Sequence, residues 1–193
     1  MRALLFSGGL DSTALAFWTK PDRLLFVDYG QVCAEGELRA ATKISTELHL
    51  VLDTRRVDVR SCGAGDMAGG VALSSEAPEF WPYRNQFLIT LAAMTYASEP
   101  MLSISIGTVC TDRVHPDGHP EFLRKLQAAL RTQADVKLEA PAISITSKTL
   151  IKRSGVPIDL LGWAFSCHRS NYACGQCRGC AKHFKTFRHG VNP

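Results

Sequence analysis

The chain has 193 residues, of which 46% are hydrophobic and 21% are charged, and its formal net charge is +4. This length suits one domain, or one domain with a small appendage, and the charge is too small to indicate nucleic-acid binding by itself. No apolar run is long enough to span a membrane, and the N-terminal residues lack the pattern of a signal peptide. We therefore expect a cytoplasmic globular protein that does not act in a membrane.

The first predicted element is a short apolar strand, 3–6, which leads through a glycine-rich turn into a helix, 13–18. The turn, Ser7-Gly8-Gly9-Leu10-Asp11-Ser12, has the features of an anion site. Its glycines let the backbone approach a ligand, and the helix N-terminus offers unpaired N–H groups and a positive dipole end. Ser7 and Ser12 add hydroxyl donors, and Ser12 is also suited to cap the helix. A plain strand-to-helix turn is the alternative interpretation.

Two common phosphate loops do not match this turn. The Walker loop requires Gly-Lys-Ser/Thr after four intervening residues, and the dinucleotide fingerprint requires Gly-x-Gly-x-x-Gly. The remaining pattern, Ser-Gly-Gly-Leu-Asp-Ser, resembles the pyrophosphate loop of the ATP pyrophosphatases. That resemblance implies a protein that adenylates its substrate and releases pyrophosphate.

The next elements predict an α/β fold. A buried strand, 23–28, is followed by a helix, 34–48, and a third strand, 50–52. Short links between alternating strands and helices favour a Rossmann-like parallel sheet with helices on both faces. Ligands of such sheets bind outside the carboxyl ends of the strands, so we expect residues 7–12 and 28–31 at the same rim.

The remaining chain continues the alternation after one long irregular segment. Residues 61–79 contain four glycines without sustained periodicity and are expected to form a lid or a mobile loop. A loop with Asp112, Arg113, His115, Asp117 and His119 follows the fourth strand. The expected elements are a helix 86–97, a strand 102–107, a helix 120–130, a strand 136–139 and a short helix 147–153.

Four of the seven cysteines, Cys167, Cys174, Cys177 and Cys180, crowd into one short C-terminal stretch. Four thiolates at this spacing suit a closed tetrahedral zinc site with a structural role. An iron–sulfur cluster is the alternative, but Ala181 stands where the common ferredoxin run has proline. Free buried thiols are a further alternative. His168 and His183 flank the cluster and are expected to be bystanders. We expect a nucleotide-binding unit at 1–160 and a zinc-binding tail at 161–193 packed on it.

Together, these motifs resemble the QueC family of ATP pyrophosphatases, the 7-cyano-7-deazaguanine synthases, over nearly the whole chain. The motifs that carry the resemblance are Ser7–Ser12, Asp28-Tyr29-Gly30-Gln31, Pro82-Tyr83-Arg84-Asn85, His115-Pro116-Asp117, Pro120-Glu121-Phe122, Glu139-Ala140-Pro141, Ser147-Lys148 and the four cysteines.

The resemblance implies an ATP-dependent ligase that adenylates 7-carboxy-7-deazaguanine, adds ammonia to give the amide, and activates again to give the nitrile. Magnesium would accompany ATP, and the protein would be a homodimer. The implied catalytic residues are Asp11, Ser12, Arg84 and Lys148. Substrate binding is assigned to Arg84, Asn85, Asp117 and His119, with helix capping the alternative for Asn85. ATP binding is assigned to Phe6, Ser7, Gly8, Gly9, Leu10, Asp11, Ser12, Asp28, Tyr29 and Gln31.

The departures from the family pattern lie on the acceptor side of the expected pocket. Gly118-His119 replace the usual Cys-Arg, His115 replaces a tyrosine, and Val32-Cys33 replace Arg-His. A second hypothesis therefore keeps adenylation but transfers the deazaguanine to the amine of a partner protein, as in QueC-like paralogues of CBASS-type antiphage operons. A third, a zinc-ribbon nucleic-acid module, would use the tail residues Lys182, Phe184, Lys185, Phe187 and Arg188.

Overall fold

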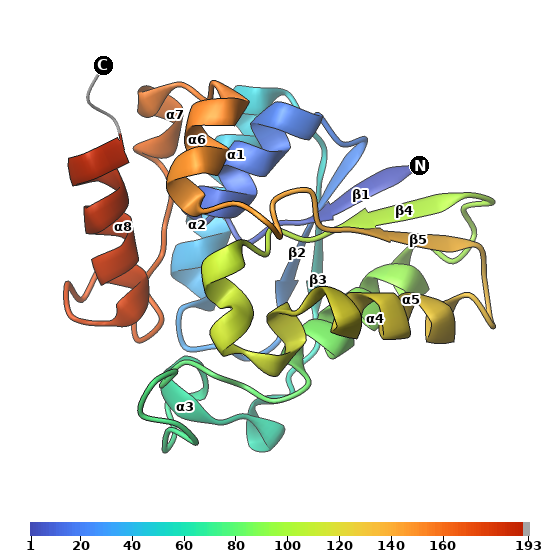
Figure 1. Ribbon diagram of the computed structural model, residues 1–193, viewed down its shortest axis with the longest axis horizontal. Helices are drawn as coiled ribbons and strands as arrows, with labels where there is room; N and C mark the ends of the chain where they lie inside the picture. Colours follow the sequence, from blue (N-terminus) through green and yellow to red (C-terminus); the bar gives the residue numbers. More distant parts are fainter. Residues whose placement is uncertain (191–193) are drawn as a thin grey trace.

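The computed structural model describes residues 1–190, with side chains as far as Phe187, so Arg188 and the end of the predicted 161–193 tail lie partly outside the described residues. Within that range the chain forms a five-stranded sheet in the order β3-β2-β1-β4-β5 (Figure 1). Every neighbouring pair of strands is parallel, which confirms the predicted α/β class. The strands are β1 (Arg2–Leu5), β2 (Arg23–Asp28), β3 (Leu52–Arg56), β4 (Leu102–Ser105) and β5 (Val136–Glu139).

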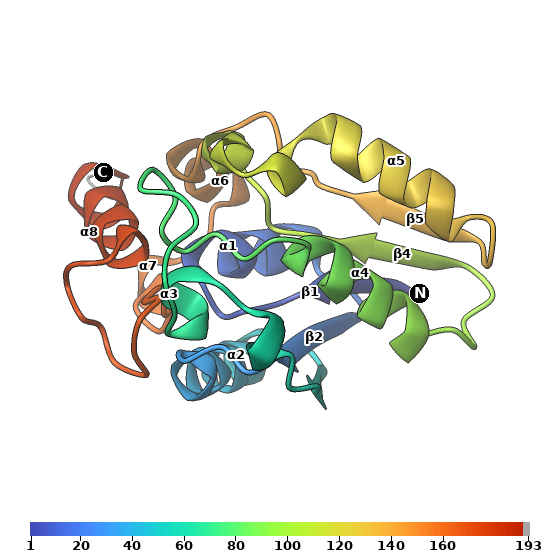
Figure 2. The same ribbon diagram turned by 90° about the horizontal axis from the view of Figure 1, so that it is seen from below.

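Helices cover both faces of the sheet, as the sequence predicts (Figure 2). In β2, Leu24 and Phe26 point into one core, while Leu25 and Val27 point into the other, because successive strand residues face opposite sides. The first core is closed by α1, α2, α6 and α7, and the second by α4 and α5. The helices are α1 (Leu10–Thr19), α2 (Ala34–Leu48), α3 (Gly65–Ala68), α4 (Arg84–Thr95), α5 (Pro120–Leu130), α6 (Ser147–Ser154), α7 (Ile158–Leu161) and α8 (Arg178–Gly190).

Several segments differ from the sequence-based expectation, and the main ones are the third strand, residues 61–79, α7 and α8. The third strand runs from Leu52 to Arg56 instead of 50–52. It is a polar edge strand that pairs with β2 on one side, so no apolar run marks its position in the sequence. The expected loop 61–79 contains the single turn α3, and it folds on itself through hydrogen bonds from Gly65 N to Val71 O and from Asp66 N to Pro78 O. Both α7 and the full length of α8 were absent from the predicted elements.

The sheet order places a crevice beside the glycine-rich turn. From β1 the chain builds β2 and β3 on one side and then crosses over to build β4 and β5 on the other. The loops after β1 and β4 therefore diverge, and this switch point is where open α/β sheets bind ligands. The two loops still approach closely, since a methyl group added at Gly107 would lie 3.5 Å from Ser12 Cα.

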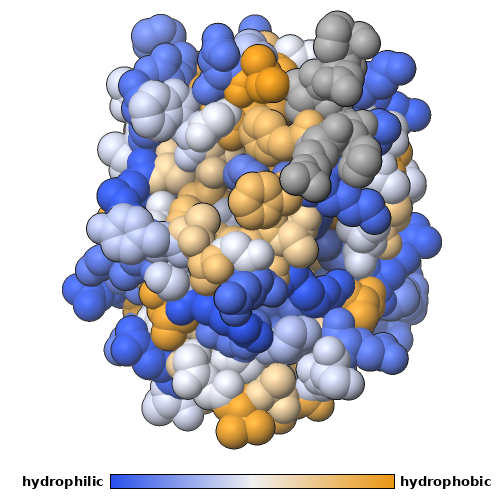
Figure 3. All heavy atoms as spheres, turned by 90° about the vertical axis from the view of Figure 1, so that its left-hand side faces the viewer, coloured by the Kyte–Doolittle hydropathy of each residue, from blue (hydrophilic) through white to orange (hydrophobic). Residues whose placement is uncertain are grey.

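The C-terminal segment packs beside the first turn of the chain. Phe165 N donates a hydrogen bond to Gly8 O at 2.9 Å, and α8 contacts α6. On the face that carries α8, apolar side chains gather near the centre and hydrophilic side chains lie around them (Figure 3). None of the helices within residues 1–190 is long and apolar enough to cross a lipid bilayer. The division into units 1–160 and 161–193 stays a prediction.

Candidate functional site

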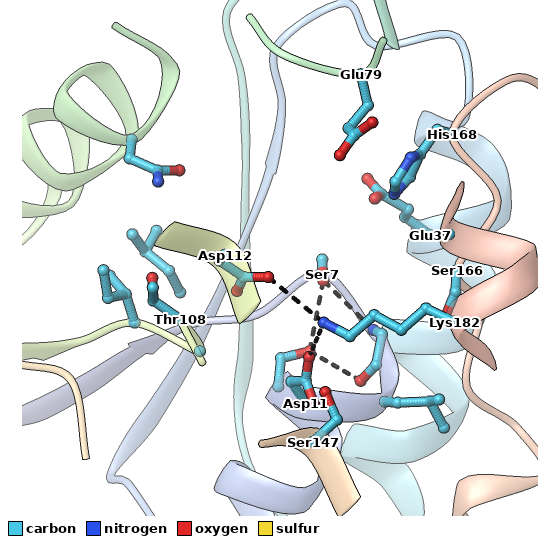
Figure 4. A pocket seen from close by; sticks show the side chains of 18 of the residues that line it. Ser7, Asp11, Glu37, Glu79, Thr108, Asp112, Ser147, Ser166, His168 and Lys182 are labelled. Atoms are coloured by element: carbon cyan, nitrogen blue, oxygen red, sulfur yellow. Dashed lines mark hydrogen bonds and ion pairs between the residues drawn. The ribbon is translucent and has the colours of Figure 1, made fainter. Parts of the chain in front are cut away.

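A cavity of about 710 Å³ lies at the switch point, and several separate parts of the chain line it. They are the loop after β1, the end of β2 with Tyr29, Glu37 of α2, the irregular 61–79 segment, the N-terminus of α4, the loop after β4, the N-terminus of α6 and the C-terminal segment from Phe165 to Thr186. Figure 4 labels side chains from most of these parts, and they converge on the same space. The site is therefore assembled from residues that are distant in the sequence.

The glycine-rich turn forms the floor of the cavity. Gly8 has φ +72°, and an added Cβ would lie 2.6 Å from Ala41 N, so only glycine fits between the turn and α2. Helix α1 begins at Leu10 with Gly9 as its N-cap, so the expected capping by Ser12 is wrong. Ser12 Oγ instead donates to Gly9 O at 3.1 Å and lies 3.4 Å from Ser7 Oγ. The two hydroxyls therefore lie side by side at the N-terminus of α1.

Lys182 of α8 contacts this turn directly, although the sequence indicated it only as a tail residue of the nucleic-acid hypothesis and not as part of the nucleotide site. Its Nζ lies 2.7 Å from Asp11 Oδ2 and 3.5 Å from Asp112 Oδ1 (Figure 4). Burial opposes the charge of the lysine, but the carboxylates of Asp11 and Asp112 outweigh it and raise its pKa above the ordinary value. Asp11 Oδ1 is buried and has no hydrogen-bond partner among the described residues.

A second wall is formed where α4 begins. Tyr83, with φ +62°, is the N-cap of α4, so Asn85 is not a capping residue. Asn85 N donates to Asp117 Oδ2 at 3.3 Å, while the buried Asp117 Oδ1 has no partner within the described chain. Arg84 Nη1 contacts Met67 Sδ at 3.1 Å. Desolvation disfavours its charge, yet the negative groups around it, including Tyr29 when ionised and Asp117, leave the pKa of Arg84 raised.

The third wall comes from the irregular segment and the tail. Glu79 Oε1 accepts hydrogen bonds from Arg178 Nη1 at 2.8 Å and from His115 Nε2 at 3.2 Å. Burial alone would raise the pKa of Glu79, but these donors and charges lower it to about 2, so the carboxylate is ionised. Arg169 of the tail pairs with Asp66 of the same segment at 2.8 Å. The 61–79 segment therefore contributes to the wall of the cavity, and two ion pairs join it to the tail.

Glu37 of α2 also faces the cavity. Gln31 Nε2 donates to Glu37 Oε2 at 2.8 Å. Desolvation is the largest influence on this carboxyl group and raises its pKa to about 7 despite that hydrogen bond and the positive charge of Arg84. The group is therefore divided between its neutral and charged forms near neutral pH, which suits proton exchange with a ligand.

The Glu37 pKa predicts a pH-dependent stability. A carboxyl group with a raised folded-state pKa stabilises the fold fully below its ordinary value of 4.5, and this contribution is lost as the pH rises through about 7. A Glu37→Gln variant keeps an acceptor for Gln31 and is expected to lose this decline in the unfolding midpoint. Thermal unfolding across that pH window tests it, with the exposed Glu76→Gln as the matched control. An unchanged decline in Glu37→Gln would exclude a raised pKa at this position.

The structure brings most of the sequence-predicted site residues to the cavity. Phe6, Ser7, Gly9, Leu10, Asp11, Ser12, Tyr29, Arg84, Asn85, Asp117 and Lys148 line it. Gly8 lies behind the lining, and His119 is exposed in a separate shallow depression near Arg113. The Asp28 carboxylate accepts from Gly30 N and pairs with Arg56, while Gln31 is occupied by backbone groups and Glu37. Asp28 and Gln31 therefore bind neighbouring groups of the rim and do not line the cavity.

The four cysteines form a compact cluster, which the sequence spacing anticipated. Their Sγ atoms all lie within 4.8 Å of one another, and two of the pairs are at 4.0 Å. Zinc–sulfur bonds of about 2.3 Å in a tetrahedron place sulfurs about 3.8 Å apart, so the cluster fits zinc. Backbone N–H groups of Gln176 and Cys177 lower the pKa of the Cys174 thiol to about 6, which favours the metal-binding thiolate. His168 and His183 lie outside the cluster, though His168 lines the cavity.

Buried polar atoms without a partner concentrate in the cavity. Such atoms are rare in folded proteins, and a group of them indicates a missing ligand. Among the described residues, those that also line the cavity are Asp11 Oδ1, Glu79 Oε2, His115 Nδ1, Asp117 Oδ1, Ser147 Oγ and His168 Nδ1. The cavity therefore has unused hydrogen-bonding capacity on every wall.

The fold and the site together define a class: a parallel α/β protein with an anion-type loop that opens, at the switch point, into a cavity lined by both polar and apolar side chains. Known sequences give a more specific assignment. A family model described as "Queuosine biosynthesis protein QueC" matches residues 2–190, and the chain belongs to the QueC family.

Full-length relatives agree with this assignment. A protein named 7-cyano-7-deazaguanine synthase 1 from Desulfitobacterium hafniense is 32% identical, with 96% of this chain and 90% of the relative aligned. A 7-cyano-7-deazaguanine synthase from Coxiella burnetii is 31% identical over 96% of this chain and 92% of the relative. Another, from Nitratiruptor sp., is 28% identical over 95% and 92%.

Proposed function

We propose that this protein is an ATP-dependent ligase that adenylates the carboxylate of 7-carboxy-7-deazaguanine and condenses it with ammonia. Attack of the carboxylate on the α-phosphate would release pyrophosphate and leave an acyl adenylate. Ammonia would displace AMP to give the amide, and a second activation would remove the amide oxygen and give the nitrile, 7-cyano-7-deazaguanine. The names of the aligned relatives support this product.

One observation carries the proposal: the glycine-rich turn and the unpartnered Asp117 Oδ1 open into one cavity of about 710 Å³. The turn has the backbone N–H groups and hydroxyls that phosphates require. Asp117 offers a buried acceptor, and the guanine-like edge of the base carries N–H donors that would pair with it. Arg84 and Lys148 supply positive charge for a reaction that develops negative charge on phosphate oxygens.

Zinc fits the four-cysteine cluster, and we propose that it is bound there by Cys167, Cys174, Cys177 and Cys180 with a structural role. Magnesium would enter with ATP, and Asp11 Oδ1, which has no partner among the described residues, suits it because magnesium prefers carboxylate ligands.

A second candidate keeps the adenylation and replaces ammonia with the amine of a partner protein. The observation that favours it is Gly118, where an added Cβ would lie 2.3 Å from Asp112 O. The cysteine that the QueC pattern usually has at this position therefore does not fit here without a backbone shift. His119, at the neighbouring departure, points into the exposed depression instead of the cavity. Both departures, Gly118 and His119, lie where the proposed site would receive the amine.

The test is to incubate the protein with ATP, magnesium, 7-carboxy-7-deazaguanine and ammonia, and to follow AMP and the base by mass spectrometry. Formation of the nitrile supports the first candidate. AMP formation without a free nitrile, together with a mass gain on a protein amine, supports the second. If the protein does not turn over ATP when the acid is present, with ammonia or with a partner-protein amine as acceptor, both candidates are contradicted.

Asp117→Asn provides the site-specific arm of this experiment. The amide keeps an acceptor for Asn85 N–H but places an NH₂ donor against the N–H donors of the base. We expect the KM for the acid to rise on the order of tenfold or more, because a mispaired buried polar group is costly. Asp135→Asn, on the exposed surface, is the matched control. An unchanged KM in Asp117→Asn would remove Asp117 from the base site.

A further inference from the structure

We propose that Lys182 is a catalytic residue of the nucleotide site, with its ammonium group against the phosphates of ATP, and that the four-cysteine element holds it there. This inference rests on the proposed function, since it assigns a residue to the adenylation step. Neither the glycine-rich turn nor the motifs of the QueC resemblance include this residue.

The first observation is the position of the ammonium group. Its Nζ lies between Asp11 on the turn after β1 and Asp112 after β4, at 2.7 and 3.5 Å (Figure 4). These two loops border the switch point, so the ammonium sits where a ligand of the sheet would lie. A lysine ammonium has three N–H donors, and two of them are accounted for by the carboxylates. The side chain is only partly covered and lines the cavity, so the third donor is available to a ligand.

The second observation is the charge around the turn. Asp11 and Asp112 would repel a polyphosphate that binds to the same turn, and Lys182 offsets part of their charge. The two carboxylate oxygens of Asp11 differ in their contacts. Oδ2 is bound by Lys182, and the buried Oδ1 has no partner among the described residues. Magnesium arriving with ATP would therefore have a carboxylate oxygen without displacing the lysine. The arrangement accommodates both positive charges beside the phosphates.

The third observation is the packing of the helix that carries Lys182. Cys177 precedes α8 and Cys180 lies in its first turn, so a metal bound by the cluster fixes the turn just before Lys182. An added Cβ at Gly179 would lie 1.9 Å from Ser166 O, which shows how closely this turn packs on the preceding segment. Phe165 N bonds to Gly8 O, so that segment is itself held against the glycine-rich turn. The packing of these segments on one another therefore places Lys182 beside the glycine-rich turn.

In the adenylation step a bond forms between the substrate carboxylate and the α-phosphorus, and the bond from that phosphorus to the bridging oxygen breaks. The electron pair goes to pyrophosphate, and no proton or redox partner is required. Negative charge grows on the leaving oxygens in the transition state, and a preorganised ammonium stabilises that state more than bound ATP. Lys182 is expected to act there.

The experiment compares Lys182→Met, Lys182→Arg and Lys125→Met in acid-dependent exchange of pyrophosphate into ATP, with MgATP affinity measured by titration calorimetry. Lys125 lies on the exposed side of α5 and is the matched control. We expect Lys182→Met to lose on the order of 100-fold in kcat, with a MgATP Kd raised several-fold, and Lys182→Arg to recover part of the rate. Zinc content and melting temperature should stay at the wild-type values. Wild-type exchange in Lys182→Met would overturn the inference.

Two further readouts keep the outcome decisive. If Lys182→Met does not fold, acylation of lysines in the wild-type protein decides: protection of Lys182 by MgATP supports the inference, and unchanged labelling overturns it. If the wild-type protein shows no exchange with 7-carboxy-7-deazaguanine, the proposed function fails on its own. MgATP affinity then decides for Lys182, since a raised Kd in Lys182→Met supports the phosphate contact and an unchanged Kd excludes it.

Discussion

An Asp11→Asn variant is expected to keep its fold and to lose on the order of 100- to 1,000-fold in acid-dependent ATP cleavage. The amide oxygen still accepts a hydrogen bond from Lys182, which retains Asp112 as a partner. What disappears is the negative charge, and with it the unpartnered carboxylate oxygen in the cavity that suits magnesium. Steady-state release of pyrophosphate is the measurement, with circular dichroism as the check on folding.

Asp135→Asn serves as the control for this change, because it alters the same side chain on the exposed surface. If Asp11→Asn retains more than a small part of the wild-type rate, the nucleotide does not bind at the turn where we place it. If Asp11→Asn does not fold, the same measurement is made on Asp11→Glu, which keeps the charge but moves the carboxylate by one methylene.

A Cys177→Ser variant is expected to lose its metal and to disorder two regions that are far apart in the sequence. The wild-type protein should contain about one zinc ion per chain, and the variant should contain much less. Without the metal, α8 loses its anchor, and Arg178 and Arg169 lose their positions opposite Glu79 and Asp66. Hydrogen exchange should therefore increase both in α8 and in residues 61–79.

Cys62→Ser is the matched control, since Cys62 is exposed and lies outside the cluster. Faster exchange in α8 alone, with residues 61–79 unchanged, would show that the two ion pairs do not couple these regions. Stoichiometric iron with sulfide in the wild-type protein would contradict zinc.

The fold was predictable because its signals are local. Buried strands such as 23–28 read as apolar runs, and the glycine-rich turn after β1 marks the strand–helix junction. The edge strand β3 was misplaced because its residues are mostly polar and partly exposed, so no alternation marks them. The four cysteines were predictable from their spacing, because in this chain all four thiols lie in one short stretch with the spacing of zinc ligands.

The site was only partly predictable, because much of it depends on tertiary contacts. Lys182 and Asp11 are 171 positions apart, and nothing local distinguishes Lys182 from an ordinary surface lysine of an amphipathic helix. Glu79 belongs to a segment without periodicity, and only its contacts with Arg178 and His115 show that it faces a cavity. The roles of Asp28 and Gln31 at the rim emerge only once their hydrogen-bond partners are known.

The contact between Lys182 and Asp11 also means that the proposed phosphate site cannot be completed before α8 has been synthesised. Residues 7–12 leave the ribosome well before the lysine that contacts them, since Asp11 and Lys182 are 171 positions apart. Ribosome-bound chains that stop before α8 therefore contain the turn, the sheet and the acid-binding wall, yet lack one side of the phosphate site. Under the proposed function, ATP cleavage would require α8, so that nascent chains without this helix would not consume nucleotide.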